Sequence, residues 1–278
     1  MGSLVWLASY PKSGNTWLRA FLANLMANSS SPLAFDEWPR FAVDEANPEY
    51  FSSVAGVSST ELDIDQICSL RENVHSKLSR MTDGRIFVKT HNLAGRFGVS
   101  HLQNWDVTSA AVYIVRNPLD VCISFASHFG LSLDDAIDCL ANVNMATGND
   151  SLFVSEILSS WSAHVQSWAA VSQRKVLIVR YEDLLSSPRS SFKRIADMLE
   201  LPSSVEILDR AIDFSTFDRL KRMEHSGGFR EAASPDVPFF RAGTADQWRT
   251  RLTPSQVARI VSAHGEQMQR FGYLPDGI

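Results

Sequence analysis

The chain has 278 residues, 45% of them hydrophobic, and a chain of this length can bury one sizeable core. Its formal net charge is −5, and a mildly acidic balance argues against nucleic acid as the main partner. The three cysteines, Cys68, Cys122 and Cys139, have no metal-ligand spacing and predict no disulfide framework, which suits a reducing compartment.

Residues 4–26 predict a strand, a tight turn and an amphipathic helix in succession. The turn reads Tyr-Pro-Lys-Ser-Gly-Asn-Thr, between the apolar run at 4–8 and the helix. It can hold an anion, because the first turn of a helix offers free N–H groups and partial positive charge. Lys12 would add a full charge and Thr16 a hydroxyl, and Gly14 lets the backbone approach an oxyanion closely.

This turn is not a Walker A loop, in which the lysine follows the second glycine of G-x-x-x-x-G-K-[ST]. Here Lys12 precedes Gly14, and no glycine opens the turn. An ordinary strand–helix connection with one exposed lysine is the alternative. We expect the turn to bind a phosphate-like group, in a manner different from that of an ordinary ATPase.

Residues 28–84 show little periodic order, and three prolines break them into short pieces. Residues 64–81 predict a helix. Five aromatic residues earlier in this region could form a satellite hydrophobic cluster or the wall of an acceptor pocket: Phe35, Trp38, Phe41, Tyr50 and Phe51.

Residues 85–91, Arg-Ile-Phe-Val-Lys-Thr-His, predict a second strand that ends in Lys89 and His91. Ligands of open α/β sheets lie outside the carboxyl ends of the strands, so both side chains stand where chemistry is expected. A histidine at a strand end can equally be a hydrogen-bonded surface residue.

Residues 110–115 predict a central parallel strand, and residues 118–129 a helix with an asparagine cap and a proline in its first turn. Arg116 is placed to donate two hydrogen bonds to a phosphate, and Ser124 lies two turns along the helix. The alternative is that Arg116 pairs with Asp120 and that Ser124 only packs.

The remaining half of the chain continues the alternation. Apolar spacing predicts a long helix over 157–168, a strand at 176–181 and a helix that starts at Ser187-Pro188. Glycines and prolines predict a mobile loop at 225–238, and a last helix begins at Thr253-Pro254 and stops at Gly272. Such alternation predicts a mostly parallel central sheet with helices on both faces.

Five motifs, in chain order, resemble those of the sulfotransferase family that uses 3′-phosphoadenosine 5′-phosphosulfate (PAPS). They are the Tyr-Pro-Lys-Ser-Gly-x-Thr-Trp loop, Lys-Thr-His, Arg-Asn-Pro-x-Asp with its later serine, Tyr-Glu-Asp, and Arg-x-Gly. The resemblance spans the chain and is to soluble, cytosolic-type, bacterial-like members. It implies one α/β sulfotransferase domain over residues 1–278, with a P-loop-like phosphosulfate-binding loop.

The resemblance also implies roles for residues. His91 would be the catalytic base, in keeping with the pKa near 6.5 of an unperturbed histidine, while Lys12 and Lys89 would meet the charge that develops on the donor. Arg116 and Ser124 would hold the 3′-phosphate. The full set implied for donor binding is Lys12, Ser13, Gly14, Asn15, Thr16, Trp17, Arg116, Ser124, Tyr181, Ser215, Phe217, Phe240, Arg241 and Gly243.

The chain departs from the family pattern in three places. In the Arg-x-Gly segment, Ala242 stands where the family usually has lysine, which removes one positive charge near the donor's 3′-phosphate, and Asp246-Gln247 stand where it usually has Gly-Asp. Asn15 stands where the animal enzymes usually have threonine, although an amide can still donate a hydrogen bond. The Lys-x-x-x-Thr-Val dimer motif is not visible near the carboxyl terminus, so the oligomeric state, a homodimer included, is open.

The expected function is transfer of a sulfuryl group from PAPS to a hydroxyl of a small-molecule acceptor, without a metal, leaving 3′-phosphoadenosine 5′-phosphate (PAP). The acceptor could be a phenol, alcohol, sterol, sugar or lipid. A P-loop small-molecule kinase and a catalytically silent nucleotide-binding protein are the alternatives; the lysine order disfavours the first, and the presence of both Lys12 and His91 the second. With no targeting segment and no run of ~18 apolar residues, we expect a cytoplasmic protein without a membrane span.

Overall fold

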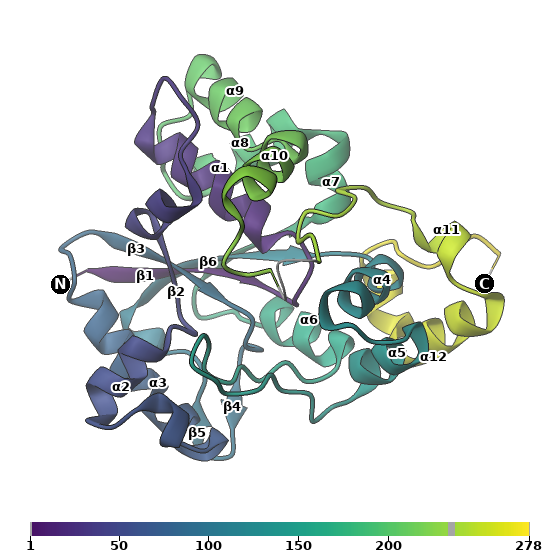
Figure 1. Cartoon of the computed structure of the whole chain (residues 1–278), viewed down its shortest axis with the longest axis horizontal. Coiled ribbons are helices and arrows are strands. Elements are labelled where there is room, and N and C mark those ends of the chain that lie inside the picture. Colours follow the sequence, from purple (N-terminus) through teal and green to yellow (C-terminus); the bar gives the residue numbers. More distant parts are fainter. Residues whose placement is uncertain (1, 233–236, 278) are drawn as a thin grey trace.

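The structure, a computed structural model, describes residues 2–232 and 237–277. Its centre is a five-stranded sheet, all parallel, in the order β2-β3-β1-β6-β7 (Figure 1). The strands are β1 (Ser3–Ser9), β2 (Ala42–Asp44), β3 (Arg85–Thr90), β6 (Thr108–Val115) and β7 (Lys175–Arg180). A separate two-stranded ribbon joins β4 (Arg96–Phe97) and β5 (Ser100–His101). The predicted α/β fold with a parallel central sheet is confirmed.

Helices cover both faces of the sheet, as predicted (Figure 1). One face carries α1 (Asn15–Ala27), α7 (Tyr181–Ser186), α8 (Pro188–Met198), α9 (Val205–Phe214) and α10 (Phe217–Gly227). The other side carries α2 (Pro48–Ala55), α3 (Ile64–Ser79), α4 (Pro118–Phe129), α5 (Leu133–Ala141), α6 (Trp161–Ala169), α11 (Trp248–Arg251) and α12 (Pro254–Arg270). Short 3₁₀ helices lie in the connections at Phe35–Arg40, Ser59–Glu61 and Trp105–Val107.

The central strand β1 shows why helices must cover both faces of the sheet. Its side chains alternate between the faces, as they do in any strand. Leu4, Trp6 and Ala8 belong to the core beneath α2, α3, α4 and α6, whereas Val5 and Leu7 belong to the core beneath α1 and α8. All five side chains are fully buried, so apolar residues are required at consecutive positions of this strand.

The long helix expected from residue 157 begins later, at Trp161. Ser159 has a φ of 58°, outside the helical region, and the hydroxyl of Ser160 accepts the N–H of Ala163 at 3.2 Å as the cap. Ile157 forms an isolated antiparallel bridge with Ala146 instead. Apolar spacing does not distinguish a buried loop from the first turn of a helix.

Several elements are absent from the sequence prediction, above all the edge strand β2 and the helices α5, α9 and α10. Because α10 extends to Gly227, the mobile loop expected at 225–238 is wrong for its first three residues. Residues 233–236 of that loop, and the termini Met1 and Ile278 of the expected domain, lie outside the described residues.

The aromatic residues of the 28–84 region are core residues rather than pocket walls. Phe35, Trp38 and Phe41 pack in a small cluster with Leu220 and Phe240, which is the satellite cluster considered above. Tyr50 and Phe51 belong to the large core. In the described part of the chain, no helix combines the length and apolar character needed to cross a membrane.

Candidate active site

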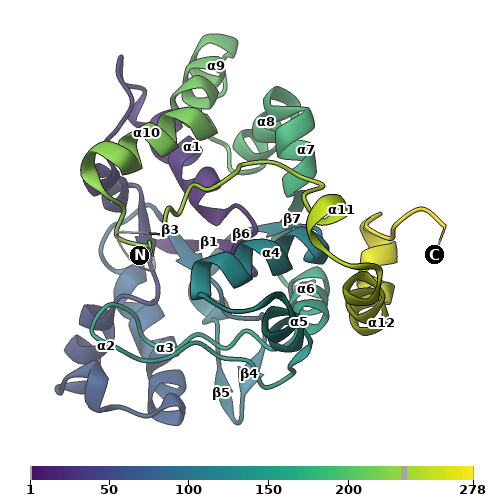
Figure 2. The same ribbon diagram turned by 45° about the vertical axis from the view of Figure 1, so that its right-hand side comes forward.

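A pocket of about 520 Å³ opens at the carboxyl ends of the strands. Figure 2 shows residues 237–247, the described stretch before α11, passing across the region between α1 and α4, and six of them line the pocket: Phe239, Phe240, Arg241, Ala242, Gly243 and Gln247. Most of the predicted site residues line this pocket: Lys12, Gly14, Asn15, Thr16, Trp17, Lys89, His91, Arg116, Ser124, Tyr181, Phe217, Phe240, Arg241 and Gly243. The fold therefore brings together side chains that lie up to 231 positions apart in the chain, from Lys12 to Gly243.

Two residues in the turn after β1 adopt left-handed backbone conformations. Lys12 has a φ of 66°, and Gly14, the cap of α1, has a φ of 107°. A Cβ on Gly14 would lie 2.7 Å from the ring of Tyr181, so both the backbone and the packing require glycine. The amide of Asn15 donates to the carbonyl oxygen of Leu7 at 2.8 Å and holds the turn against β1.

Lys12 is partly buried, not an exposed lysine of an ordinary connection. Its Nζ lies 3.6 Å from the centroid of the Phe239 ring, and a cation over an aromatic face is attracted by the ring. Burial lowers the pKa of Lys12 to about 7, and the nearby carboxylate of Glu231 opposes this shift only in part. Near neutral pH, this side chain can therefore gain or lose its charge with its surroundings.

His91 follows β3 and is held in one tautomer. Its Nδ1 lies 2.7 Å from the carbonyl oxygen of Ser9, and because a carbonyl can only accept, Nδ1 carries the proton. The lone pair is then on Nε2. Burial lowers the pKa of His91 well below its ordinary value, and the positive charge of Lys89 lowers it further. The ring is therefore neutral at pH 7 and can accept a proton at Nε2.

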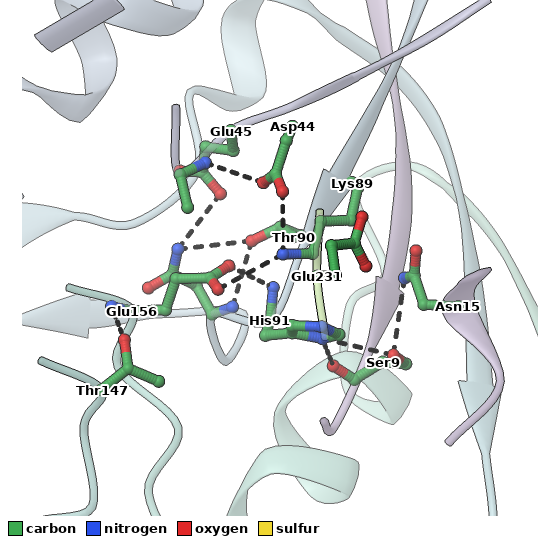
Figure 3. A network of polar contacts seen from close by, with 12 residues as sticks. Ser9, Asn15, Asp44, Glu45, Lys89, Thr90, His91, Thr147, Glu156 and Glu231 are labelled. Carbon is green, nitrogen blue, oxygen red and sulfur yellow. Dashed lines mark hydrogen bonds and ion pairs between the residues drawn. The ribbon is translucent and has the colours of Figure 1, made fainter. Parts of the chain in front are cut away.

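Two groups fix the backbone at His91. Its N–H donates to Oε1 of Glu156 at 2.6 Å, and its carbonyl oxygen accepts from Nε2 of His164 at 2.9 Å (Figure 3 shows the first). Nδ1 of His164 lies 2.9 Å from the hydroxyl of Tyr113. Hydrogen bonds to both its N–H and its carbonyl oxygen thus fix the backbone of His91.

Lys89 is paired with carboxylates. Its Nζ lies 3.1 Å from Oδ2 of Asp44 and 3.7 Å from Oε2 of Glu156 (Figure 3). Burial alone would lower the pKa of Lys89, but these two carboxylates outweigh it and raise the pKa, so the side chain is charged. Burial raises the pKa of Glu156 to about 7. Neither carboxylate can be predicted from the sequence, because Asp44 lies on the three-residue strand β2 and Glu156 in a loop without a motif.

Arg116 does not pair with Asp120, the alternative considered for it. Its guanidinium donates to the carbonyl oxygens of Lys12 at 2.9 Å and Thr244 at 3.1 Å, and lies 4.3 Å from the Tyr181 ring centroid. Its Nε is buried and has no hydrogen-bond partner within residues 2–232 and 237–277. An unpaired buried donor beside the turn suits an anionic ligand.

Asp120 instead anchors the late segment. Its carboxylate accepts the backbone N–H groups of Asp246 at 2.7 Å and Trp248 at 3.1 Å. Gln247, in the stretch that departs from the family pattern, accepts a hydrogen bond from Arg241 at 2.7 Å. The departure therefore leaves Arg241 in the pocket wall, held by a side chain that the family pattern does not provide.

Three residues that the resemblance assigns to donor binding, Tyr181, Ser215 and Phe217, divide into two groups. Tyr181 and Phe217 line the pocket, and a Cβ on Gly243, whose φ is 63°, would overlap the ring of Phe217. Ser215 does not line it: the side chain is fully buried, and its hydroxyl donates to the carbonyl oxygen of Ala211 at 2.8 Å. Ser13 is also buried and absent from the lining, and its hydroxyl has no partner among the described residues.

Comparison with known proteins agrees with this architecture. The sequence profile of the sulfotransferase domain matches residues 3–272. Mouse sulfotransferase 1B1 is 23% identical over 94% of this chain and 81% of its own length. Cytosolic sulfotransferase 10 of Arabidopsis thaliana is 25% identical over 96% of this chain and 78% of its own.

Solved structures share the fold. Mouse sulfotransferase SULT7A1, complexed with PAP, has a TM-score of 0.63 at 18% identity, over 96% of this chain and 84% of its own. Retinol dehydratase, in complex with androsterone and PAP, has a TM-score of 0.65 at 20% identity, over 99% and 83%. Because the domain profile covers nearly the whole chain, the protein belongs to the sulfotransferase domain family and is a transferase of sulfur-containing groups.

Proposed function

We propose that the protein transfers the sulfuryl group of PAPS to a hydroxyl of a small-molecule acceptor, with His91 as the general base. The observation that carries this proposal is the tautomer of His91. Its Nδ1–H is committed to the carbonyl oxygen of Ser9, which leaves the Nε2 lone pair for a proton in the same pocket as Lys12. A base and a cation in one pocket are what transfer to a hydroxyl requires.

The residues around the turn suit the donor. The first turn of α1 and the buried Nε of Arg116 are donors that a 5′-phosphosulfate and a 3′-phosphate could use, whereas the side chain of Ser13 does not line the pocket. Two structural neighbours are complexed with PAP, which supports the same nucleotide here. Tyr181 and Phe217 offer ring surfaces for adenine. Ser215 would act only indirectly, because its hydroxyl fixes the end of α9, two residues before Phe217.

In the proposed reaction, the acceptor oxygen forms a bond to sulfur while the bond from sulfur to the 5′-phosphate oxygen breaks. Nε2 of His91 takes the hydroxyl proton, and PAP leaves. Lys12 meets the charge on the departing oxygen, and Lys89 the charge on the sulfuryl oxygens. Lys89 keeps its charge for this task because Asp44 and Glu156 hold it protonated.

The acceptor is proposed to be a small hydroxyl compound that contains an apolar ring or chain. Phe129, Phe153 and Phe239 line the same pocket as His91, and aromatic walls are typical of small-molecule sites. Neighbouring structures contain androsterone or retinol, which supports an acceptor of this kind. We also propose a single domain over residues 1–278 and a cytoplasmic location, in line with the cytosolic relatives.

The experiment that tests the donor assignment compares PAP with AMP, which lacks only the 3′-phosphate. Wild-type protein should bind PAP at least about tenfold more tightly, since a charge-assisted hydrogen bond contributes about 1.5–3 kcal/mol. Replacing Arg116 with alanine should remove most of that preference, because it should lower the affinity for PAP more than that for AMP. Calorimetric titration measures both affinities.

The control for that experiment is Arg259→Ala. Arg259 lies on α12 and pairs with Asp134 and Asp138. Its loss should leave the PAP preference unchanged. Equal affinity of wild-type protein for PAP and AMP would contradict the proposed donor.

The lowered pKa of Lys12 predicts that PAP binding takes up protons above neutral pH. With a pKa of about 7, Lys12 is mostly neutral at pH 8, and the donor's negative charge should restore its proton. Below pH 7 the lysine is already charged, so its contribution to affinity is complete there and falls as pH rises. Calorimetry at pH 8 in buffers of different ionisation enthalpy should show uptake of close to one proton.

The matched control is Lys12→Met, in which this uptake should disappear. Glu156, whose pKa is also about 7, is already ionised at pH 8 and would show the same behaviour in both proteins. Uptake that persists in the variant would mean that another group titrates.

A further inference from the structure

The start of α1, directly after the turn that follows β1, contacts an anion within the protein itself, the carboxylate of Glu231. Nη2 of Arg19 lies 2.6 and 2.7 Å from its two oxygens, and the hydroxyl of Thr16 donates to Oε2 at 3.4 Å. Figure 3 shows the Glu231 side chain beside Lys89. Neither Glu231 nor Arg19 belongs to a sequence motif, although Glu231 lines the same pocket as Lys12.

The position of this carboxylate is that of a ligand. Thr16 is the second residue of α1, so the carboxylate lies at the first turn of the helix, where anions are stabilised. Two of the cations around it, Lys12 and Lys89, are those proposed to act on the donor. Together with Arg19, they hold the pKa of Glu231 below its ordinary value, although burial alone would raise it. Glu231 is therefore ionised and compensates charges that would otherwise be unpaired.

A phosphate oxygen and this carboxylate compete for one hydroxyl proton. Thr16 has a single O–H, which is directed at Glu231, and the lone pairs of that hydroxyl accept from Arg19 at 3.2 Å. A donor phosphate at the first turn of α1 would also lie against the carboxylate in a partly buried site, where like charges repel strongly. The two anions cannot share this position.

We propose that Glu231 is a resident anion of the donor site: it neutralises the site when no donor is bound, and the donor's 5′-phosphosulfate must displace it. This inference rests on the proposed function. It makes Glu231 a residue that weakens donor affinity and favours release of the nucleotide product after transfer.

The test is Glu231→Gln, which keeps the size of the side chain and an oxygen for Arg19 but removes the charge. PAP should bind about tenfold more tightly, equivalent to about 1.4 kcal/mol. Adenosine 3′-monophosphate, which lacks the 5′-phosphate, should bind with unchanged affinity. The free variant should also melt at a lower temperature than wild type, because Arg19, whose side chain is only 8% exposed, loses its ion pair.

The matched control is Asp150→Asn. Asp150 also lines the pocket, and its Oδ1 accepts the N–H groups of Leu152 and Phe153, which an asparagine oxygen can still do. If Glu231 weakens PAP binding because it contacts the site of the 5′-phosphate, loss of the Asp150 charge should change PAP affinity by less than about twofold. A larger change would mean that the overall charge of the pocket controls the affinity.

A second measurement needs no variant. In a crystal structure of the wild-type protein with PAP, the Glu231 carboxylate should have left Thr16. The inference would be overturned by unchanged or weaker PAP binding in the glutamine variant, or by a carboxylate still bonded to Thr16 beside bound PAP. Either result would mean that Glu231 only holds its segment against α1. The proposed function fails separately, if wild-type protein does not distinguish PAP from AMP.

Discussion

Replacing His91 with alanine should lower kcat by about 10²–10⁴-fold, the usual loss when a positioned general base is removed. Affinity for PAP should change little, because the imidazole faces the acceptor's proton rather than the nucleotide in the proposed reaction. The measurement is single-turnover sulfuryl transfer from labelled PAPS, with an acceptor identified by screening and PAP affinity measured in parallel.

Two further variants make this test specific. In His91→Asn, the side-chain amide can replace Nδ1–H as donor to the carbonyl oxygen of Ser9. This variant therefore keeps the hydrogen bond but lacks the base, and its activity should fall as far as that of the alanine variant. His128 is the rival base: it lines the pocket, and burial lowers its pKa to about 4, so it is also neutral at pH 7. If His128→Ala abolishes transfer and His91→Ala does not, the base has been assigned to the wrong histidine.

Lys12→Met should lower kcat by about 10²–10³-fold, a loss typical for one group that stabilises charge in the transition state. The ammonium is needed most when the bond between sulfur and the 5′-phosphate oxygen breaks, so kcat should fall more than KM rises. Methionine keeps the apolar stem beside Phe239 and loses only the charge.

Thermal unfolding provides the control for Lys12. No carboxylate lies within ion-pair distance of Lys12 among the described residues, so its replacement leaves no buried charge unpaired and the melting temperature should change little. The exposed Lys221 of α10, replaced in the same way, should affect neither property. A large fall in melting temperature with nearly normal kcat would show that Lys12 acts in folding rather than in transfer.

Four of the five strands of the sheet, and the turns that follow them, can be predicted from the sequence. The apolar runs that became β1, β3, β6 and β7 are each followed by a polar motif, and parallel strands place their carboxyl ends at one edge of the sheet. That geometry is enough to bring Lys12, His91 and Arg116 into one pocket, as observed. Local signals also locate α4, whose asparagine cap and first-turn proline lie where predicted.

The charges and partners of these side chains depend on contacts between distant segments of the chain. The three-residue edge strand β2 is too short to show a period, yet it carries Asp44, which pairs with Lys89 across 45 positions. Glu156 reaches His91 across 65 positions and Glu231 reaches Arg19 across 212, each from a segment with no periodic pattern. Periodicity and motifs report neighbours within a few residues, whereas burial and ion pairing depend on which distant segments fold against each other. For that reason, the motifs alone do not predict the protonation of His91, the pKa of Lys12 or the contact of the Glu231 carboxylate with Thr16.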